Sequence, residues 1–79
     1  MKAIVVSPKG VLYEGPAQKV GAVSVEGAFE VLEGHAPFVA QLPPGNLTLS
    51  TDSQPKAFSH EGGFLWVDGE GLVRALLRT

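Results

Sequence analysis

Glycine and proline interrupt this chain so often that an α-helix of ordinary length has almost no room to form. The 79 residues include ten glycines and six prolines, more than the usual share of about 12% for the two together. Glycine is unfavourable inside a helix and proline removes a backbone donor, so each interruption favours a turn. Between the turns, short extended segments are predicted at residues 2–6, 11–14, 17–25, 29–33, 38–42, 47–51, 56–60 and 64–67. The pattern is typical of an all-β chain folded as a sandwich or small barrel.

Two segments leave alternatives open. Residues 17–25 carry apolar side chains on both faces, as expected for a strand that bends between two sheets. Residues 72–77 have apolar side chains at i, i+1, i+4 and i+5, a spacing that fits an amphipathic helix. A run of six residues after a glycine-rich turn equally fits a buried strand, so periodicity alone does not decide this segment.

The composition predicts one small globular domain over residues 1–79. Hydrophobic residues make up 44% and charged residues 18%, which is too apolar for a disordered chain. The absence of cysteine excludes disulfides and thiolate metal sites. A net charge of −2 argues against a nucleic-acid partner held through its phosphates. No apolar run reaches the roughly 18–20 residues of a membrane-spanning helix, and the N-terminal run is too short for a signal peptide. We therefore expect a cytosolic chain with no direct membrane insertion.

No residue pattern indicates catalysis, a cofactor or a metal site. His35 lies in a loop without a second histidine or cysteine at zinc-ligand spacing, so we expect it to hydrogen-bond nearby backbone. Ser59, His60 and Glu61 have the letters of a catalytic triad, but neighbours on a strand point to opposite faces. The glycine pair at 62–63 lacks the lysine and the helix of a phosphate loop. It predicts a place where a side chain would be blocked by neighbouring backbone.

Apolar residues exceed what one small core can absorb. The mean hydropathy of +0.17 is high for a domain with so much surface. We therefore expect part of the surface to dock on a partner through apolar side chains with a polar rim. The single tryptophan, Trp66, fits either the core or such an interface.

Four segments of the chain have motifs whose order and spacing are those of one known family. Residues 26–38 read Glu-Gly-Ala-Phe-Glu-Val-Leu-Glu-Gly-His-Ala-Pro-Phe and resemble the central signature of the epsilon subunit family of F-type ATP synthase (delta in mitochondria). Residues 4–15 resemble its opening hairpin, residues 42–47 its Leu-x-Pro-Gly turn, and residues 62–67 its Gly-Gly-Phe-Leu-x-Val strand. The resemblance covers essentially the whole chain.

The resemblance implies a flattened β-sandwich of about ten short strands, with residues 72–77 as the last strand. It implies a non-catalytic rotor subunit of the central stalk that binds the gamma subunit and the polar loops of the c-ring. Such a subunit couples ion-driven rotation to ATP synthesis, with no cofactor and no nucleic acid. It works in F1, on the cytoplasmic face of the bacterial inner membrane. Because the sequence stops at Thr79, we expect the C-terminal helical hairpin that inhibits hydrolysis in the family to be absent.

The resemblance also suggests which residues meet each partner. The candidates for the gamma interface are Ser7, Pro8, His35, Ala36, Pro37, Phe38, Ala40 and Leu42. The candidates for a loop that faces the c-ring are Glu26, Gly27, Ala28 and Phe29. Three positions depart from the family pattern: Ala28 replaces a usual acidic residue, Glu30 a common glycine and Glu33 a common proline. A charged contact with the c-ring is therefore not assigned to Ala28.

Other functions remain open at this point. The first is a free-standing β-sandwich module that binds an unrelated protein, since a fold does not determine a function. The second is a small hydrolase that uses His35 or His60. The third is an oligonucleotide-binding barrel that stacks bases on its aromatic side chains, which the acidic charge disfavours.

Overall fold

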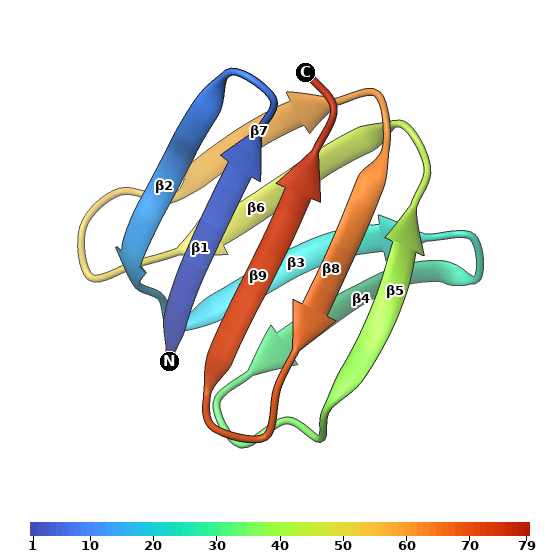
Figure 1. The fold of residues 1–79 in the computed structure, drawn as a ribbon. Coiled ribbons are helices and arrows are strands. Elements are labelled where there is room, and N and C mark those ends of the chain that lie inside the picture. The colour runs from blue at the N-terminus through green and yellow to red at the C-terminus, as the bar shows by residue number, and fades with distance from the viewer.

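Nine strands arranged in two packed sheets make up the computed structural model, which describes all of residues 1–79 (Figure 1). The strands are β1 (Lys2–Ser7), β2 (Gly10–Pro16), β3 (Lys19–Ser24), β4 (Gly27–Leu32), β5 (Phe38–Leu42), β6 (Gly45–Ser50), β7 (Lys56–His60), β8 (Gly63–Val67) and β9 (Leu72–Leu77). One sheet has the order β2-β1-β9-β8-β5 and the other the order β4-β3-β6-β7. The prediction of an all-β sandwich is confirmed. The structure contains no helix long and apolar enough to cross a membrane.

The segment that periodicity left undecided is the central strand of the larger sheet. Strand β9 runs parallel to β1 and antiparallel to β8, with Ile4 opposite Arg74 and Trp66 opposite Arg74. Both edges of β9 are therefore hydrogen-bonded within the sheet. Pairing on both sides, rather than any local preference, makes this segment a strand, as the family resemblance implied.

The prediction that residues 17–25 bend between two sheets is wrong. Strand β3 lies entirely in the four-stranded sheet, paired with β4 and β6. Val20 and Ala22 face the core, whereas Val23 and Val25 are exposed at the end of the β3–β4 hairpin. The second apolar face of this segment is thus simply solvent-exposed surface.

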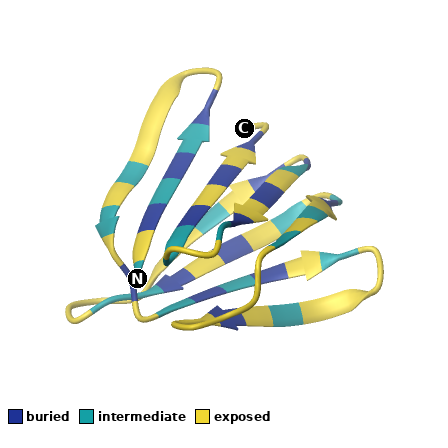
Figure 2. Ribbon diagram, turned by 60° about the horizontal axis from the view of Figure 1, so that its bottom comes forward, coloured by how far each residue is buried: buried dark blue, intermediate teal, exposed yellow.

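Alternation along the strands places one apolar residue in two between the sheets (Figure 2). In β9, for example, Val73, Ala75 and Leu77 are buried while Arg74 and Leu76 are exposed. The buried cluster consists of Ala3, Val5, Ala17, Val20, Ala22, Val31, Leu42, Leu47, Leu49, Leu65, Val67, Val73, Ala75 and Leu77. These side chains come from both sheets, so the two sheets share one core.

Backbone meets backbone closely at the start of β8. A Cβ atom built on Gly63 would collide with the carbonyl group of Leu76 on the neighbouring β9. The preceding Gly62 has a φ of +132°, a conformation that other residues rarely adopt. The interpretation of this glycine pair as a blocked position, rather than a phosphate loop, is confirmed.

Candidate functional site

The outer face of the five-stranded sheet carries large apolar side chains in register. On this face Ile4, Arg74, Trp66 and Val39 lie directly opposite one another across β1, β9, β8 and β5. Residues that face each other across neighbouring strands share one side of a sheet, so these four form a continuous row. The next row consists of Val6, Leu76, Phe64 and Gln41.

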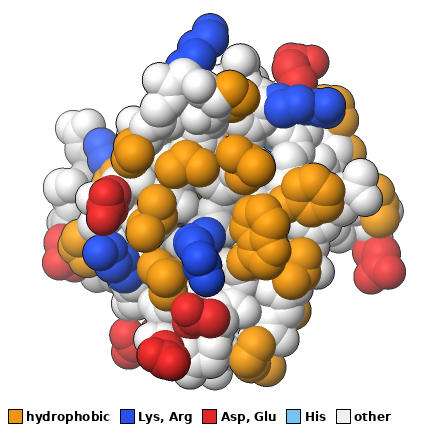
Figure 3. Space-filling view, in the orientation of Figure 1, with side chains coloured by type: hydrophobic (Ala, Val, Ile, Leu, Met, Phe, Trp, Pro, Cys, Tyr) orange, Lys and Arg blue, Asp and Glu red, His pale blue; other side chains and the backbone are white.

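Most of these apolar side chains are open to solvent. The exposed fractions are 63% for Val39, 43% for Phe64, 41% for Leu76 and 38% for Trp66. The rings of Phe64 and Trp66 lie 5.9 Å apart, centre to centre. We call this surface the apolar face, made of Ile4, Val6, Val39, Phe64, Trp66 and Leu76 around Arg74. Hydrophobic side chains gather over the same strands in Figure 3. Trp66 therefore belongs to the surface and not to the core.

The apolar face is hollowed at its centre. A depression of about 350 Å³ is lined by Ile4, Val6, Trp66, Arg74, Ala75 and Leu76. Concave apolar surface with a single charged group at its margin is typical of a surface that receives a side chain from a partner.

The outer face of the four-stranded sheet is very different. One row across it contains Glu30, Gly21, Thr48 and Ala57, and the next pair towards β7 is Asn46 and Ser59. We call this surface the polar face, made of Lys19, Gly21, Glu30, Asn46, Thr48, Ala57 and Ser59. An ion pair of 3.2 Å joins Lys19 to Glu30 across it. Exposed valine and leucine side chains occur only towards its ends, at Val23 and Leu32.

A groove of about 500 Å³ separates the β3–β4 hairpin from β5 at the edge of the sandwich. Its lining includes residues 24–29 on one side and residues 38–41 with His35 on the other. The ring of Phe38 contacts Phe29 edge-on, with centroids 5.6 Å apart, and lies 4.8 Å from the ring of His35. The groove thus brings the predicted c-ring loop next to part of the predicted gamma interface.

The predicted gamma-interface residues do not form one patch. Ser7 and Pro8 lie at the end of the sheet that holds Leu77, whereas residues 35–37 lie beyond the opposite end, where Phe38 pairs with Val67. Ser7 and Leu42 are buried, and Phe38 and Ala40 pack partly against the core. The side chains exposed to a partner are Pro8, His35, Ala36 and Pro37.

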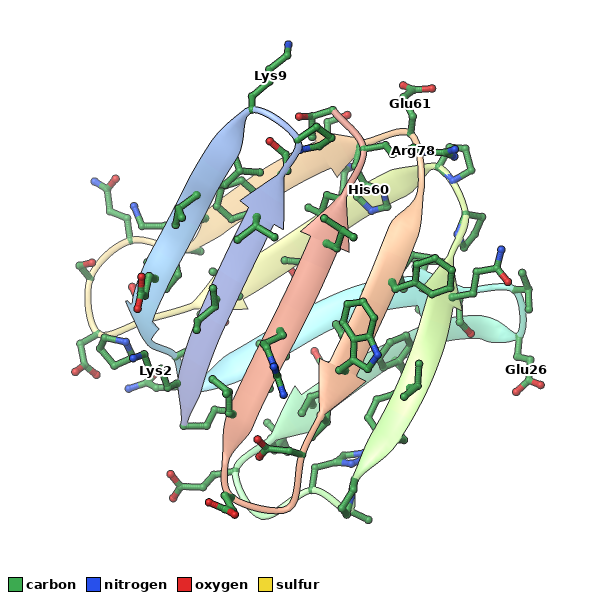
Figure 4. The ribbon with its side chains drawn as sticks, in the orientation of Figure 1. Lys2, Lys9, Glu26, His60, Glu61 and Arg78 are labelled. Atoms are coloured by element: carbon green, nitrogen blue, oxygen red, sulfur yellow. The ribbon has the colours of Figure 1, made fainter.

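The predicted c-ring loop is the turn of the β3–β4 hairpin. The side chain of Glu26 projects outwards from the tip of this turn (Figure 4). Its backbone N–H donates to Ser24 Oγ over 3.1 Å, and Gly27 has a φ of +125°, so the turn is tightly closed. Ala28 is exposed as well, whereas Phe29 is half-buried against Phe38.

Both histidines form hydrogen bonds with nearby backbone groups. The Nδ1 atom of His35 lies 2.7 Å from the carbonyl oxygen of Ala36, which confirms the predicted hydrogen bond to local backbone. His60 is buried, and its Nδ1 accepts a hydrogen bond from the N–H of Gly62 over 3.0 Å. Burial lowers the pKa of His60, and the nearby carboxylate of Glu61 opposes part of that shift. Ser59 points to the opposite, exposed side of β7.

The turn around His60 is fixed by the end of the chain. Arg78 lies close to Glu61 and His60 in Figure 4, and its Nη2 donates to the carbonyl oxygen of Glu61 over 2.9 Å. The backbone N–H of Glu61 in turn donates to the carbonyl oxygen of Arg78 over 2.7 Å. These contacts give the three residues a structural role. No group of three or more His, Cys, Asp or Glu side chains lies close enough together to hold a metal ion.

The apolar face was not identified from the sequence. Its signal is the fully apolar character of the segments 3–6 and 64–67, in which both sides of the strand are hydrophobic. A continuous apolar run indicates a strand covered on both faces. Here only one face is covered within the chain.

Comparison with known proteins identifies one family, the same in the family model and in the individual relatives. The family model described as the β-sandwich domain of the ATP synthase delta/epsilon chain matches residues 1–73. The ATP synthase epsilon chain 1 of Nitrobacter hamburgensis is 41% identical over 68 residues, which cover 86% of this chain and 50% of that protein. The epsilon chain of Caulobacter vibrioides is 40% identical, with coverage of 86% and 79%. The epsilon chain of Chlorobium limicola is 35% identical over 79 residues, with coverage of 99% and 86%.

Two solved structures share the fold. A chain in the central stalk and c-ring structure of the Tetrahymena thermophila mitochondrial ATP synthase has a TM-score of 0.88 at 20% identity, over 100% of this chain and 63% of that one. A chain in the Euglena gracilis mitochondrial ATP synthase structure has a TM-score of 0.88 at 25% identity, over 95% and 48%. This chain therefore spans about half the length of some relatives and most of the length of others.

Proposed function

This chain belongs to the delta/epsilon chain family of ATP synthase, and we propose that it is a non-catalytic subunit of the central stalk, bound to the gamma subunit and in contact with the c-ring. In this role it links the rotor in the membrane to the F1 head, so that ion-driven rotation is coupled to ATP synthesis. Residues 1–79 act as one sandwich domain in that assembly.

The apolar face is the observation that carries the proposal. A row of exposed tryptophan, phenylalanine, leucine and valine side chains is unfavourable in water, and on monomeric proteins such areas mark sites of protein association. On the opposite, polar face the exposed large apolar side chains are only Val23 and Leu32, towards its ends, with no aromatic residue among them. We therefore assign gamma binding to the apolar face. Of the segments expected at this interface, the first hairpin contributes Val11 at one edge of the sheet and β5 contributes Val39 at the other.

The tip of the β3–β4 hairpin is the proposed contact with the c-ring. Glu26 is exposed at this tip and offers a carboxylate to polar loops, whereas Ala28 has no charge to offer. The tip lies at the end of the four-stranded sheet where Ser24 pairs with Gly27, and the β6–β7 turn lies at the other end. A subunit held through the apolar face can thus present this turn to a second partner.

The complex that we propose lies at the cytoplasmic face of a bacterial inner membrane. The bacterial epsilon chains among its relatives support this location. The chain itself touches the membrane sector only through the c-ring loops and inserts no segment into lipid.

Titration against the gamma subunit of the same organism tests the proposal. We expect tight binding with one copy of this chain per gamma subunit. No binding at micromolar concentrations would overturn the central-stalk role in favour of an unrelated protein-binding module. In a second step, the chain is added to ATP synthase that lacks its epsilon subunit and is reconstituted in vesicles. Recovery of ion-driven ATP synthesis supports coupling, and binding without any recovery would contradict it.

Two single-cysteine variants test the proposed contact between the hairpin tip and the c-ring. The chain has no cysteine, so Glu26→Cys introduces a unique cross-linking site at the hairpin tip. Asp52→Cys, in the turn at the other end of the four-stranded sheet, is its matched control. We expect the first variant, and not the second, to cross-link to cysteines placed in the polar loops of the c-ring. Equal yields from both would contradict the assigned orientation.

A further inference from the structure

One charged side chain stands in the middle of the apolar face. Arg74 is exposed and lies in register between Ile4 on β1 and Trp66 on β8. Its neighbours along β9 on the same face are Leu72 and Leu76. Arg74 makes no ion pair: the three in the chain join the N-terminal amine to Glu33, Lys2 to Glu14, and Lys19 to Glu30.

The acidic side chain that the charge of Arg74 influences, Asp68, already has hydrogen-bond partners. The carboxylate of Asp68 accepts hydrogen bonds from the backbone N–H groups of Glu70 and Leu72, over 2.8 and 3.1 Å. These bonds hold it in the β8–β9 turn. The positive charge of Arg74 also lowers the pKa of Asp68, but by less than these two hydrogen bonds do. Of the other cations on this side of the sheet, Lys2 is paired with Glu14 at 3.5 Å, and Arg78, beside Phe64 and Leu76, donates to the carbonyl oxygen of Glu61.

A partner that covers the apolar face must provide a hydrogen-bond acceptor for the guanidinium group of Arg74. A guanidinium group stays protonated in proteins and has no neutral form in which to be buried. Burying it without an acceptor is strongly unfavourable, whereas a carboxylate placed against it forms charge-assisted, bidentate hydrogen bonds. The hollow of about 350 Å³ beside Arg74, lined mostly by apolar groups, offers the room for such a side chain.

The same charge argues against a second copy of this chain as the occupant. Two copies that meet through one patch are related by a two-fold axis, so equivalent residues approach each other. If the axis passes near the centre of the apolar face, two Arg74 guanidinium groups come together with no carboxylate between them. Like charges facing each other across an interface are unfavourable. Charge complementarity therefore selects a different chain that carries an acidic group.

We propose that the gamma subunit covers the apolar face with a segment whose aspartate or glutamate carboxylate binds Arg74, flanked by apolar side chains that pack on Trp66 and Ile4. The inference rests on the proposed function, because the gamma subunit is the partner named there. It adds the chemistry of the segment that is recognised and makes Arg74 a determinant of specificity.

Substitutions at Arg74 test this chemistry through the affinity for the gamma subunit. Arg74→Leu keeps the site apolar but leaves the partner's carboxylate buried and unpaired, so we expect binding at least about 30-fold weaker. Arg74→Glu is expected to weaken it further through repulsion. Lys56→Glu, which makes the same change of charge at the exposed start of β7 in the four-stranded sheet, is the control and should leave affinity within about twofold. Thermal unfolding of each variant verifies that the fold is retained.

The outcomes separate this inference from the proposed function. If the wild-type chain binds and Arg74→Leu binds within about threefold of it, the acidic contact is overturned while gamma binding stands. If the wild-type chain does not bind, the proposed function falls and the inference falls with it. Rescue gives an independent readout: each acidic residue of gamma is changed to lysine and tested against Arg74→Glu. Recovery of affinity for one such pair supports the inference, and failure of every pair overturns it.

Discussion

The two outer faces of this sandwich have opposite chemistry. On the apolar face, Phe64, Trp66 and Leu76 stand exposed in adjacent strands. On the polar face, the equivalent central positions are occupied by Gly21, Asn46 and Thr48. An antiparallel sheet usually has one face against the core and one polar face in water, as the wholly antiparallel four-stranded sheet does here. The five-stranded sheet, in which β1 and β9 are parallel, has an apolar outer face instead.

This difference indicates that a partner covers the outer face of the five-stranded sheet. The five-stranded sheet has an apolar inner face that closes the core and an apolar outer face that no other part of the chain covers. Since exposed apolar area is unfavourable, it indicates an interface rather than a contribution to the stability of the isolated chain. Substitutions on the two sides of the same strand should therefore separate folding from binding.

The largest effect is expected where β8 meets β9. Gly63→Ala places a methyl group against the carbonyl of Leu76 and forces the central strands apart. We expect a loss of about 3 kcal/mol or more in the free energy of unfolding, measured by urea denaturation. Gly45→Ala is the matched control, because the nearest atom to its added Cβ is a backbone oxygen at 3.9 Å. Equal stability of the two variants would contradict the close approach of β8 and β9.

Leu65→Ala probes the inner side of the same strand. Leu65 is fully buried, so its truncation leaves a cavity and should lower the free energy of unfolding by about 2–5 kcal/mol. The adjacent Trp66→Ala should cost less than Leu65→Ala, because Trp66 is partly exposed on the surface and its removal leaves no enclosed cavity. Denaturant titration of both proteins compares them directly. A larger stability loss at Trp66 than at Leu65 would reverse the assignment of the two faces.

Trp66→Ala probes the outer side through binding. A tryptophan near the centre of an interface is a typical hot spot, so we expect affinity for the gamma subunit to fall by about 2 kcal/mol or more, measured calorimetrically. Thr48→Ala on the polar face serves as the control and should leave the affinity unchanged. If Thr48→Ala weakens binding and Trp66→Ala does not, gamma binds the other sheet.

His60 adds a pH dependence that comes from the core and not from either outer face. Burial lowers its pKa in the folded state, so the unfolded chain binds the proton more readily. Stability is therefore fully present above about pH 6.5, the ordinary pKa of histidine, and falls as the pH drops from there through the folded pKa. Protonation also removes Nδ1 as the acceptor for Gly62 N–H.

Urea denaturation across this pH range checks the sign of that effect. His60→Gln should flatten the change in stability between about pH 7.5 and pH 5, because the titrating group is gone. His35→Gln, at the exposed histidine, should keep the wild-type profile. Loss of the pH dependence in the His35 variant alone would show that the wrong histidine had been identified.

The smallest effects are expected at the two surface ion pairs, one on each side of the sandwich. Lys2–Glu14 and Lys19–Glu30 have side chains that are roughly half exposed and charged atoms 3.5 and 3.2 Å apart. Lys2→Met and Lys19→Met should each change the free energy of unfolding by no more than about 1 kcal/mol. A markedly larger loss in either variant, measured by thermal denaturation, would show that the outer faces do contribute to folding.

The fold could be predicted because its local and global signals agree. The glycine and proline spacing marked the turns, and Leu47 and Leu49 alternate with polar residues as buried strand positions do. The segment 72–77 could not be assigned by periodicity because its strand character depends on pairing with β1 and β8. Similarly, no local signal shows whether the second apolar face of a segment such as 17–25 will be covered.

The candidate site was predicted less completely for a related reason. Resemblance pointed to loop segments, and the structure places some of their side chains, such as Ser7 and Leu42, inside the core. The apolar face is assembled from strands far apart in the sequence, and its members align only through the register of β1, β9, β8 and β5. The same register places Arg74 at the centre of the apolar face. The sequence alone shows only a charged residue between apolar neighbours.

Single cysteines placed on the two outer faces test the central claim most directly. The chain has no cysteine of its own, so Leu76→Cys marks the apolar face and Thr48→Cys marks the polar face. Reaction of each with a maleimide is followed by mass spectrometry, in the free chain and in its complex with the gamma subunit. We expect both cysteines to react in the free chain and only the one at position 76 to be protected in the complex. Protection at position 48 with continued reaction at position 76 would contradict the account.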